Sequence, residues 1–196
     1  MSDLATSIAA APYIVGLGGA IRSGSSTEKA LRHVLAAAER GGARTCLISG
    51  EGLQLPLYAP EERDRCEAAR TLIAELGKAD GIILGSPGYH GTLSGVIKNA
   101  LDYAEDLRDD VRPYFSGRAV GCVATGGGWQ GAVHTLGALR NIVHALRGWP
   151  SPMGAAINTS EGVFDAGGAC LMPGVAATLD QIAVEVVGFA RARTLA

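Results

Sequence analysis

Five short apolar segments alternate with longer amphipathic segments along this chain, and this alternation restricts the folds open to it. The apolar segments are residues 13–18, 45–48, 81–84, 119–124 and 152–157. Each is short and rich in branched side chains, which is typical of strands buried on both faces. Apolar residues at helical spacing mark the other segments, which are residues 28–40, 61–78, 94–107, 134–146 and 175–192. The pattern predicts an α/β fold: a five-stranded parallel sheet with helices on both faces.

The length of the chain limits the number of domains. With 196 residues the chain can bury one full core, whereas two cores would both be small. We expect residues 1–12 to form a flexible N-terminal arm and residues 13–196 to form a single domain. Glycine contributes 28 residues, about double its average share of roughly 7%. Because the excess gathers where predicted strands end, we interpret it as loop chemistry and not as disorder.

Charge and cysteine content narrow the possible partners and surroundings. A net charge of -2 provides no basic surface for nucleic acid. The N-terminal segment lacks the basic region of a secretory signal, and no apolar run approaches the roughly 20 residues of a membrane span. The cysteines show neither a C-x-x-C pair nor metal-ligand spacing; they are Cys46, Cys66, Cys122 and Cys170. We therefore expect a cytoplasmic protein with reduced thiols, no metal, and no nucleic-acid or membrane partner.

Three of the predicted strands end in loops rich in glycine and polar residues. The loops are residues 19–27, 85–91 and 125–131. In the doubly wound strand order 2-1-3-4-5, strands one and three flank the switch point of the sheet, and strand four lies beside strand three. The three loops should therefore meet at one edge of the sheet, which favours a common ligand over three unrelated connections.

The first loop has the chemistry of a phosphate site. It supplies Arg22 and the hydroxyl groups of residues 23, 25, 26 and 27, where the following helix presents free N–H groups and the positive end of its dipole. The loop lacks the lysine of an NTPase P-loop, and its glycines do not have G-x-G-x-x-G spacing. The alternative is a Ser/Thr helix cap beside a surface arginine.

The second and third loops suit a flat ring. Residues 87–91 combine a proline, two glycines, an aromatic ring and an imidazole, and residues 125–128 are a threonine followed by glycines. Backbone N–H groups in such turns can reach the polar edge of an isoalloxazine ring, and Tyr89 can pack on or beside it. The alternative is an ordinary connection between a strand and a helix.

The same residues resemble the NADPH-dependent FMN reductase family. Residues 19–27 are similar to its phosphate loop G-S-x-R-x-x-S-x-[NT], and residues 86–102 match its ring loop S-P-x-Y-x-x-x-x-x-G-x-x-K-N-x-x-D. Residues 125–127, with Gly131, look like its third loop. Two positions depart from the pattern. Ala20 replaces a usual serine. Gly88 replaces a commonly larger residue, and we expect this glycine to widen the site or to alter its backbone contacts.

The resemblance implies a flavodoxin-like fold that binds FMN as a homodimer or homotetramer. It implies that the phosphate lies at the first loop and the ring at the second and third. The predicted cofactor-binding residues are Arg22, Ser25, Ser26, Thr27, Pro87, Gly88, Tyr89, His90, Gly91, Thr125, Gly126 and Gly127. Because hydride transfer belongs to the cofactor, no catalytic side chain is predicted.

The function predicted from the resemblance is an NAD(P)H-dependent FMN reductase. NADPH or NADH would deliver hydride from its nicotinamide to flavin N5, and the electrons would pass to free flavin or another small acceptor by a ping-pong mechanism. A flavin-dependent monooxygenase is a possible partner. One alternative is a quinone, azo or metal-oxyanion reductase that uses the same FMN. Others are a flavodoxin-type electron carrier and a scaffold without cofactor.

Several other residues leave their role open at this stage. His90 is either a proton donor or nicotinamide contact, or simple polar lining. Trp129 either shields the flavin or a subunit interface, or packs in the core, or is a simple surface anchor. Ser86 is not in a G-x-S-x-G elbow, which argues against a serine hydrolase. Lys98 and Asp102 lie in the less favourable order for a pair within one helix, so we expect them to pair across subunits or to remain solvated.

Overall fold

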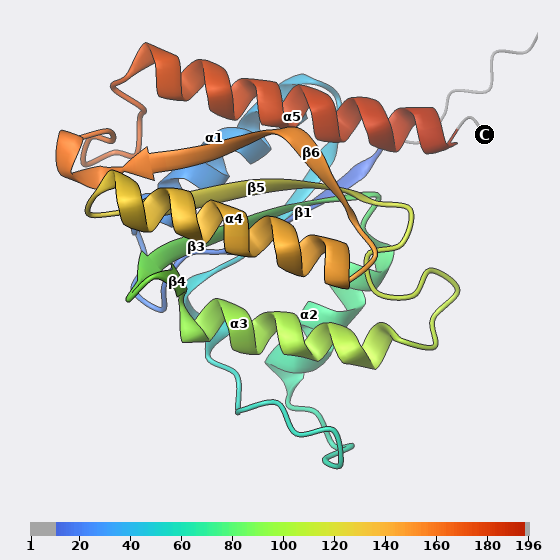
Figure 1. Cartoon of the computed structure of the whole chain (residues 1–196). Coiled ribbons are helices and arrows are strands. Elements are labelled where there is room, and N and C mark those ends of the chain that lie inside the picture. The colour runs from blue at the N-terminus through green and yellow to red at the C-terminus, as the bar shows by residue number, and fades with distance from the viewer. Residues whose placement is uncertain (1–10, 195–196) are drawn as a thin grey trace, which may run out of the picture.

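The computed structural model describes residues 11–194, and its centre is a sheet of parallel strands (Figure 1). The strands are β1 (Tyr13–Gly18), β2 (Arg44–Ile48), β3 (Gly81–Tyr89), β5 (Ala119–Gly126) and β6 (Trp149–Asn158), in the order β2-β1-β3-β5-β6. A two-residue strand, β4 (Thr92–Leu93), pairs antiparallel with the end of β3. The predicted parallel sheet and its order 2-1-3-4-5 are confirmed, with later labels shifted by one because β4 was not predicted.

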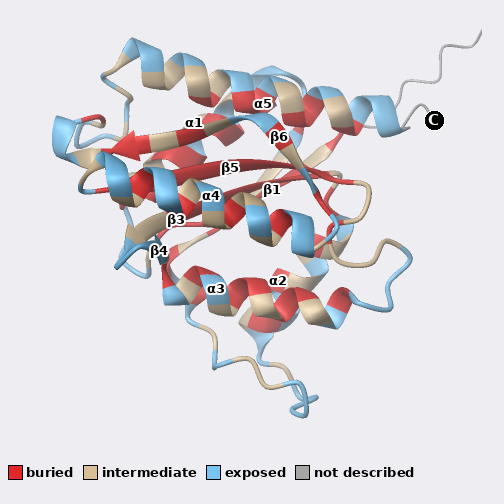
Figure 2. Cartoon of the chain, viewed as in Figure 1, coloured by how far each residue is buried: buried red, intermediate tan, exposed pale blue. Residues whose placement is uncertain are grey.

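Helices cover both faces of the sheet. On one face lie α1 (Ser26–Arg40) and α5 (Pro173–Thr194), and on the other lie α2 (Glu67–Lys78), α3 (Gly95–Asp102) and α4 (Trp129–Ala145) (Figure 1). Neighbouring strand residues point to opposite faces, so Ile14 joins the core beneath α1 and α5 while Val15 joins the other core. The central strands β1, β3 and β5 are accordingly buried along most of their length, whereas the edge strands β2 and β6 are only partly buried (Figure 2).

Two helix starts, those of α2 and α4, differ from the prediction by more than two residues. The helix expected from residue 61 begins at Glu67, because residues 61–66 carry charges without an apolar face and Arg65 is held outside the helix. The helix expected from residue 134 begins at Trp129, directly after Gly128. The long glycine-rich loop predicted there is therefore shorter, and the N-terminus of α4 lies close to the end of β5.

Strand β3 is longer than predicted. It continues past Leu84 as far as Tyr89, paired with β5 up to Pro87 and Thr125 and then with β4. His90 and Gly91 form the two-residue turn between β3 and β4, with φ of 49° and 95°, which is the left-handed geometry of a type I′ hairpin. The segment expected to be a ligand loop is thus a strand end and a tight turn.

Two further expectations concerned the N-terminal arm and membrane-spanning segments. Of the predicted arm, residues 1–10 lie outside the described residues. Pro12 is buried, and its carbonyl accepts a hydrogen bond of 2.9 Å from the N–H of Arg44. Within residues 11–194, no helix combines the length and apolar character required to cross a membrane.

A fully buried arginine, Arg118, binds the C-terminal end of α2, at the edge of the sheet opposite the three polar loops. Arg118 donates through Nε to the carbonyl of Ala79 (2.8 Å) and through Nη2 to that of Gly77 (2.7 Å), and Nη1 reaches Tyr114 (2.8 Å) and Arg112 (3.3 Å). The carbonyls of Gly77 and Ala79 lie at the C-terminal end of α2, which is the negative end of the helix dipole, and there carbonyls have no donor within the helix. Burial lowers the pKa of Arg118 to about 10, so the side chain remains charged at neutral pH.

A second arginine fixes the segment that precedes α2. The guanidinium of Arg65 lies 4.7 Å from the ring centroid of Tyr58 and 5.3 Å from that of Tyr103. It also binds both carboxylate oxygens of Asp106, at 2.7 and 2.9 Å. Asp106 and Tyr103 belong to the 3-10 turn Tyr103–Leu107, so these contacts attach the chain before α2 to the end of α3.

We expect the contribution of Asp106 to stability to depend on pH. Hydrogen bonding from Arg65 lowers the pKa of Asp106 below its usual value, and the unfolded value is about 3.9. The contribution is therefore complete above about pH 4 and is lost as the pH falls through the native pKa. The free energy of unfolding of Asp106→Asn should be lower than that of the wild type at pH 7 and approach it below pH 4. Asp64→Asn, at a carboxylate 97% exposed, is the control. A difference between Asp106→Asn and wild type that is constant with pH would contradict the prediction.

Candidate functional site

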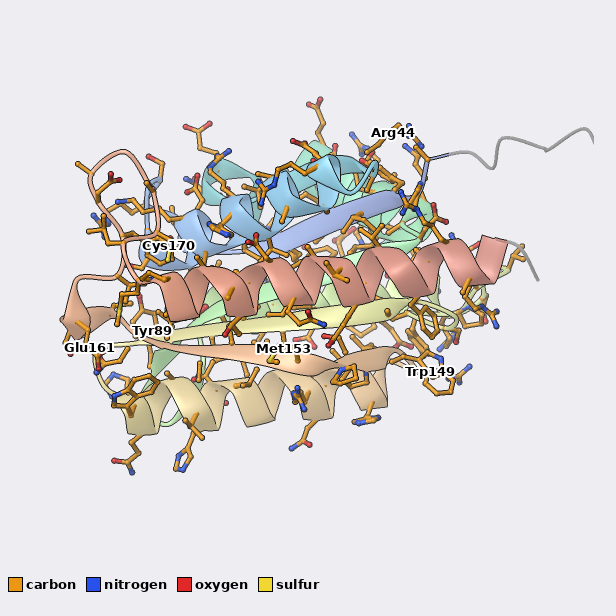
Figure 3. The ribbon with its side chains drawn as sticks, turned by 90° about the horizontal axis from the view of Figure 1, so that it is seen from above. Arg44, Tyr89, Trp149, Met153, Glu161 and Cys170 are labelled. Carbon is orange, nitrogen blue, oxygen red and sulfur yellow. The ribbon has the colours of Figure 1, made fainter. Side chains whose placement is uncertain are left out.

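Segments at the ends of β1, β3 and β5, together with Thr159 after β6, form one cavity at the carboxyl edge of the sheet. Its volume is about 290 Å³, and its lining residues are Ala20, Arg22, Ser25, Ser26, Thr27, Pro87, Gly88, Tyr89, Thr125, Gly126, Gly127 and Thr159. Figure 3 shows Tyr89 at this end of the sheet and Arg44 at the opposite end. Every predicted cofactor-binding residue lines the cavity except His90 and Gly91, which lie in the exposed turn between β3 and β4. The predicted meeting of the three loops is therefore observed.

The first wall of the cavity, which is formed by lining residues within 20–27, has the groups needed to bind an anion. Ser25 caps α1, and its Oγ accepts a hydrogen bond of 3.2 Å from the N–H of Glu28. The N–H groups of Ser26 and Thr27 belong to the first turn, which has no acceptor within the helix. Arg22 is exposed and makes no hydrogen bond or ion pair with any other residue in the described range. An uncommitted cation, free N–H groups and the helix dipole therefore face the same space.

A pair of hydroxyl groups connects the first wall to the third wall, which is formed by residues 125–127. Thr27 Oγ1 lies 2.6 Å from Thr125 Oγ1, and both residues are buried. One of the two hydroxyls must donate to the other, so the remaining O–H is free to donate to a ligand. The link joins the start of α1 to the end of β5 and fixes the distance between these two walls.

The second wall is formed by residues 87–89, and there is little free space behind it because α4 approaches closely. A side chain on Gly88 would place its Cβ 2.6 Å from Thr135 Oγ1 and 2.9 Å from the Gly131 carbonyl oxygen. The glycine therefore does not widen the cavity, since α4 occupies the space of the missing side chain. Beside it, the ring of Tyr89 is 55% exposed at the edge of the cavity.

We expect Gly88→Ala to weaken flavin binding and to lower stability by about 1–3 kcal/mol, the range for overpacking a close contact. The added methyl group would push the β3 end away from α4. The matched control is Gly137→Ala on α4, outside the lining of the cavity, where a Cβ would meet no atom within 4 Å. Thermal unfolding and FMN titration of both variants test this. Equal behaviour of the two would show that the contact with α4 is unimportant.

Two contributors to the site were not predicted. Thr159 follows β6 and donates through Oγ1 to the Gly126 carbonyl at 3.0 Å, which holds the third wall. The sequence signal for Thr159 was the polar run Asn158-Thr159-Ser160 at the end of a predicted strand. The same criterion, polar residues after a strand, had selected the loops after the other three strands. Glu28 lies behind the first wall, and its signal was the spacing Ser-x-x-Glu of a capping box.

Other singled-out residues have structural contacts. Ser86 Oγ donates to the Pro87 carbonyl at 2.8 Å and accepts from the Ser94 N–H at 3.0 Å. Ser94 in turn caps α3. Lys98 and Asp102 pair within one helix, where Lys98 Nζ lies 2.5 Å from Asp102 Oδ1. The lysine side chain is long enough to reach the carboxylate one helical turn away despite the less favourable order, and a pair across subunits stays a prediction.

Trp129 begins α4 and is 53% exposed, so it does not pack in the core. It also lies outside the lining of the site cavity. Shielding of a flavin or of a subunit interface stays a prediction, and simple anchoring at the surface remains the alternative. Among residues 11–194, no group of three or more His, Cys, Asp or Glu side chains is placed to hold a metal ion.

The donor set fits FMN. One end of the cavity offers a cation, N–H groups and hydroxyls, which suit a phosphate. The other end is bordered by Pro87–Tyr89 and by the backbone of residues 125–127, which suits the edge of a flat ring. Gly127 has open space at its Cβ position, so a planar group can approach the backbone there.

Comparison with known proteins agrees with this arrangement. The family model described as NADPH-dependent FMN reductase matches residues 12–162. An NADPH azoreductase of Bacillus sp. (strain OY1-2) is 37% identical over 93 residues, 47% of each chain. An FMN-dependent NADPH-azoreductase of Staphylococcus aureus (strain USA300) is 41% identical over 83 residues, 42% of this chain and 40% of the relative. Each alignment thus spans less than half of the relative's length.

A solved structure shows the same fold. The flavoenzyme NAD(P)H:(acceptor) oxidoreductase FerB from Paracoccus denitrificans superposes over 93% of this chain and 98% of its own, with a TM-score of 0.75 and 22% sequence identity. At that identity the likeness concerns the fold alone. The family model, in contrast, covers all the segments that line the cavity, and the chain belongs to the NADPH-dependent FMN reductase family.

Proposed function

We propose that this protein is an NAD(P)H-dependent oxidoreductase that binds FMN in the cavity at the sheet edge. The observation that carries the proposal is the pairing of an anion-binding wall with two backbone-lined walls in one cavity. FMN, when bound, supplies the hydride acceptor, flavin N5. The chain's own residues bind and orient: Arg22 and the first turn of α1 hold the phosphate, and residues 125–127 offer N–H groups to the polar edge of the ring.

The lining of the cavity also argues for chemistry carried by a cofactor. Its ionisable side chains are those of Arg22 and Tyr89, and it includes no carboxylate, histidine or lysine. Proton-transfer catalysis by side chains of the lining is therefore restricted to the Tyr89 hydroxyl at the exposed edge of the cavity, whereas hydride transfer to a bound flavin needs no catalytic side chain.

We propose small molecules as electron acceptors, with free flavin or a quinone first and an azo compound as the second candidate. The azo candidate is favoured by the two similar relatives, which are named azoreductases. Nicotinamide and acceptor are expected to bind in turn at the exposed side of Tyr89, which gives ping-pong kinetics. A flavin-dependent monooxygenase that takes up the reduced flavin is a possible partner.

Loading and reduction test the proposed function. Protein purified with FMN should retain a yellow chromophore, and rapid mixing with NADPH or NADH under nitrogen should bleach the flavin band. Turnover with free FMN, quinones and azo dyes, each with both nicotinamides, then identifies the acceptor. A colourless protein that fails to take up FMN would refute the proposal. A loaded protein that neither nicotinamide bleaches would instead be an electron carrier.

We further propose a cytoplasmic homodimer or homotetramer. Ile21 and Leu57 are 48% and 86% exposed and line an apolar groove of about 630 Å³ beside the first loop. Exposed apolar surface of this kind favours association. All four cysteines are free, which accords with a reducing compartment. Sedimentation velocity should give a mass of two or four chains, and Leu57→Asp should reduce it. A monomer at micromolar concentration would contradict the oligomer.

A further inference from the structure

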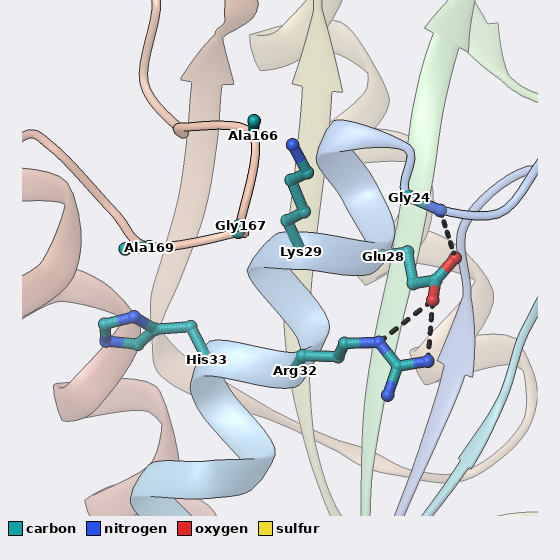
Figure 4. A pocket seen from close by; sticks show the side chains of 9 residues that line it. Gly24, Glu28, Lys29, Arg32, His33, Ala166, Gly167 and Ala169 are labelled. Atoms are coloured by element: carbon teal, nitrogen blue, oxygen red, sulfur yellow. Dashed lines mark hydrogen bonds and ion pairs between the residues drawn. The ribbon is translucent and has the colours of Figure 1, made fainter.

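A buried carboxylate lies directly behind the loop that is proposed to hold the phosphate. Glu28 is 5% exposed. Its Oε2 accepts a hydrogen bond of 3.0 Å from the N–H of Gly24, and its Oε1 accepts from Nε and Nη2 of Arg32 at 2.9 and 2.7 Å (Figure 4). A negative charge at this position opposes the binding of an anion, so its presence needs a physical reason.

The contact to Gly24 gives that reason. In a standard capping box the glutamate bonds to the N–H of the capping residue itself. Here the carboxylate reaches one residue further back, so the N–H groups of Ser25, Ser26 and Thr27 have no acceptor among the described residues. Gly24 has a φ of 70°, a left-handed conformation that glycine accepts readily. Glu28 thus fixes the turn and leaves three N–H groups to the ligand.

The contact to Arg32 removes the electrostatic cost. Arg32 lies one helical turn after Glu28, and its side chain is 63% exposed. It lines a second cavity of about 430 Å³ together with Gly24 and Glu28 (Figure 4), and it is not among the residues that line the proposed phosphate site. The cation therefore balances the buried carboxylate without entering the cavity where the flavin is proposed to bind.

We propose that Glu28 and Arg32 are a pair of positioning residues for the flavin phosphate. Glu28 holds the loop through Gly24, and Arg32 cancels the charge of Glu28 so that the cavity still attracts an anion. The inference rests on the proposed function, because it assumes that the phosphate of FMN occupies the first wall.

Binding of FMN and of riboflavin, which lacks the phosphate, tests the pair. Arg32→Met leaves the carboxylate uncompensated and should weaken FMN binding about tenfold, with riboflavin binding unchanged. Glu28→Gln/Arg32→Met removes the uncompensated charge and should restore most of the FMN affinity. Glu28→Ala should weaken FMN binding because the Gly24 N–H loses its acceptor, whereas Glu28→Gln keeps an acceptor and should bind FMN nearly as the wild type does. Raising the salt concentration should reduce the defect of Arg32→Met.

The matched control is Arg40→Met, on the same helix, where the arginine pairs with Asp180 at 3.0 Å and does not approach the loop. Arg32→Met and Arg40→Met binding FMN equally well would overturn the inference, as would a double variant no better than Arg32→Met. In both cases a wild type that prefers FMN to riboflavin would leave the proposed function standing. A wild type that binds the two flavins equally would overturn the phosphate site and the inference together. Circular dichroism of each variant verifies folding, and the double variant keeps the test valid if Arg32→Met does not fold.

Discussion

Arg118→Met is expected to lower the free energy of unfolding by about 1–3 kcal/mol, the range for leaving a buried hydrogen-bond acceptor without its donor. The guanidinium is fully buried and donates to four carbonyl groups, including those of Gly77 and Ala79 at the end of α2. Methionine fills similar space but donates nothing, so the carbonyls of Ala79 and Tyr114 would lose their donor from Arg118, and that of Gly77 would keep only its contact with Arg112. Urea unfolding at neutral pH measures the loss.

Arg112→Met is the matched control for this prediction. Its side chain is 40% exposed, lies 3.7 Å from Asp80 and donates to the Gly77 carbonyl at 3.2 Å. Because solvent can replace these contacts, its loss should cost below about 1 kcal/mol. If both variants lost the same stability with equal m-values, the four carbonyl contacts of Arg118 would not be the cause.

Arg22→Ala is expected to weaken FMN binding by about 1.5–3 kcal/mol, the contribution of a hydrogen bond to a charged group. Arg22 lines the cavity and has no other partner among the described residues. Its loss therefore affects the ligand and leaves the fold intact. Riboflavin binding should remain unchanged, because riboflavin has no phosphate for the guanidinium to contact. Fluorescence titration with the two flavins separates these effects.

Arg44→Ala provides the comparison for Arg22. This arginine is also exposed but lies at the opposite end of the sheet (Figure 3). It contacts the ring of Tyr13 and should not influence FMN affinity. If Arg22→Ala and Arg44→Ala bound FMN equally well, the phosphate would have to lie elsewhere.

The fold could be predicted because its determinants are local and repeated. Segments such as Tyr13–Gly18 are too short and too apolar for surface helices, and the segments between them have helical periodicity. The strand order then followed from the general rule for doubly wound sheets. The site followed from the same rule, since polar loops after β1, β3 and β5 must meet when these strands are neighbours.

The remaining features depend on contacts between distant residues. The start of α2 at Glu67 is set by Arg65 lying between two tyrosine rings, and those rings come from residues 58 and 103. The reason for glycine at position 88 is the approach of α4, forty-odd residues later in the chain. No local pattern encodes either contact. Thr159 and Glu28, in contrast, had local signals that could have been used.

The hydroxyl contact between Thr27 and Thr125 has a consequence for how such a site can be altered. The two residues are separated by 98 positions, yet their side chains share one hydrogen bond in the lining of the cavity. A transplanted loop without a hydroxyl group at one of these positions would leave the buried hydroxyl at the other without its partner. The phosphate wall and the third wall therefore form one unit for engineering, and both must be exchanged together.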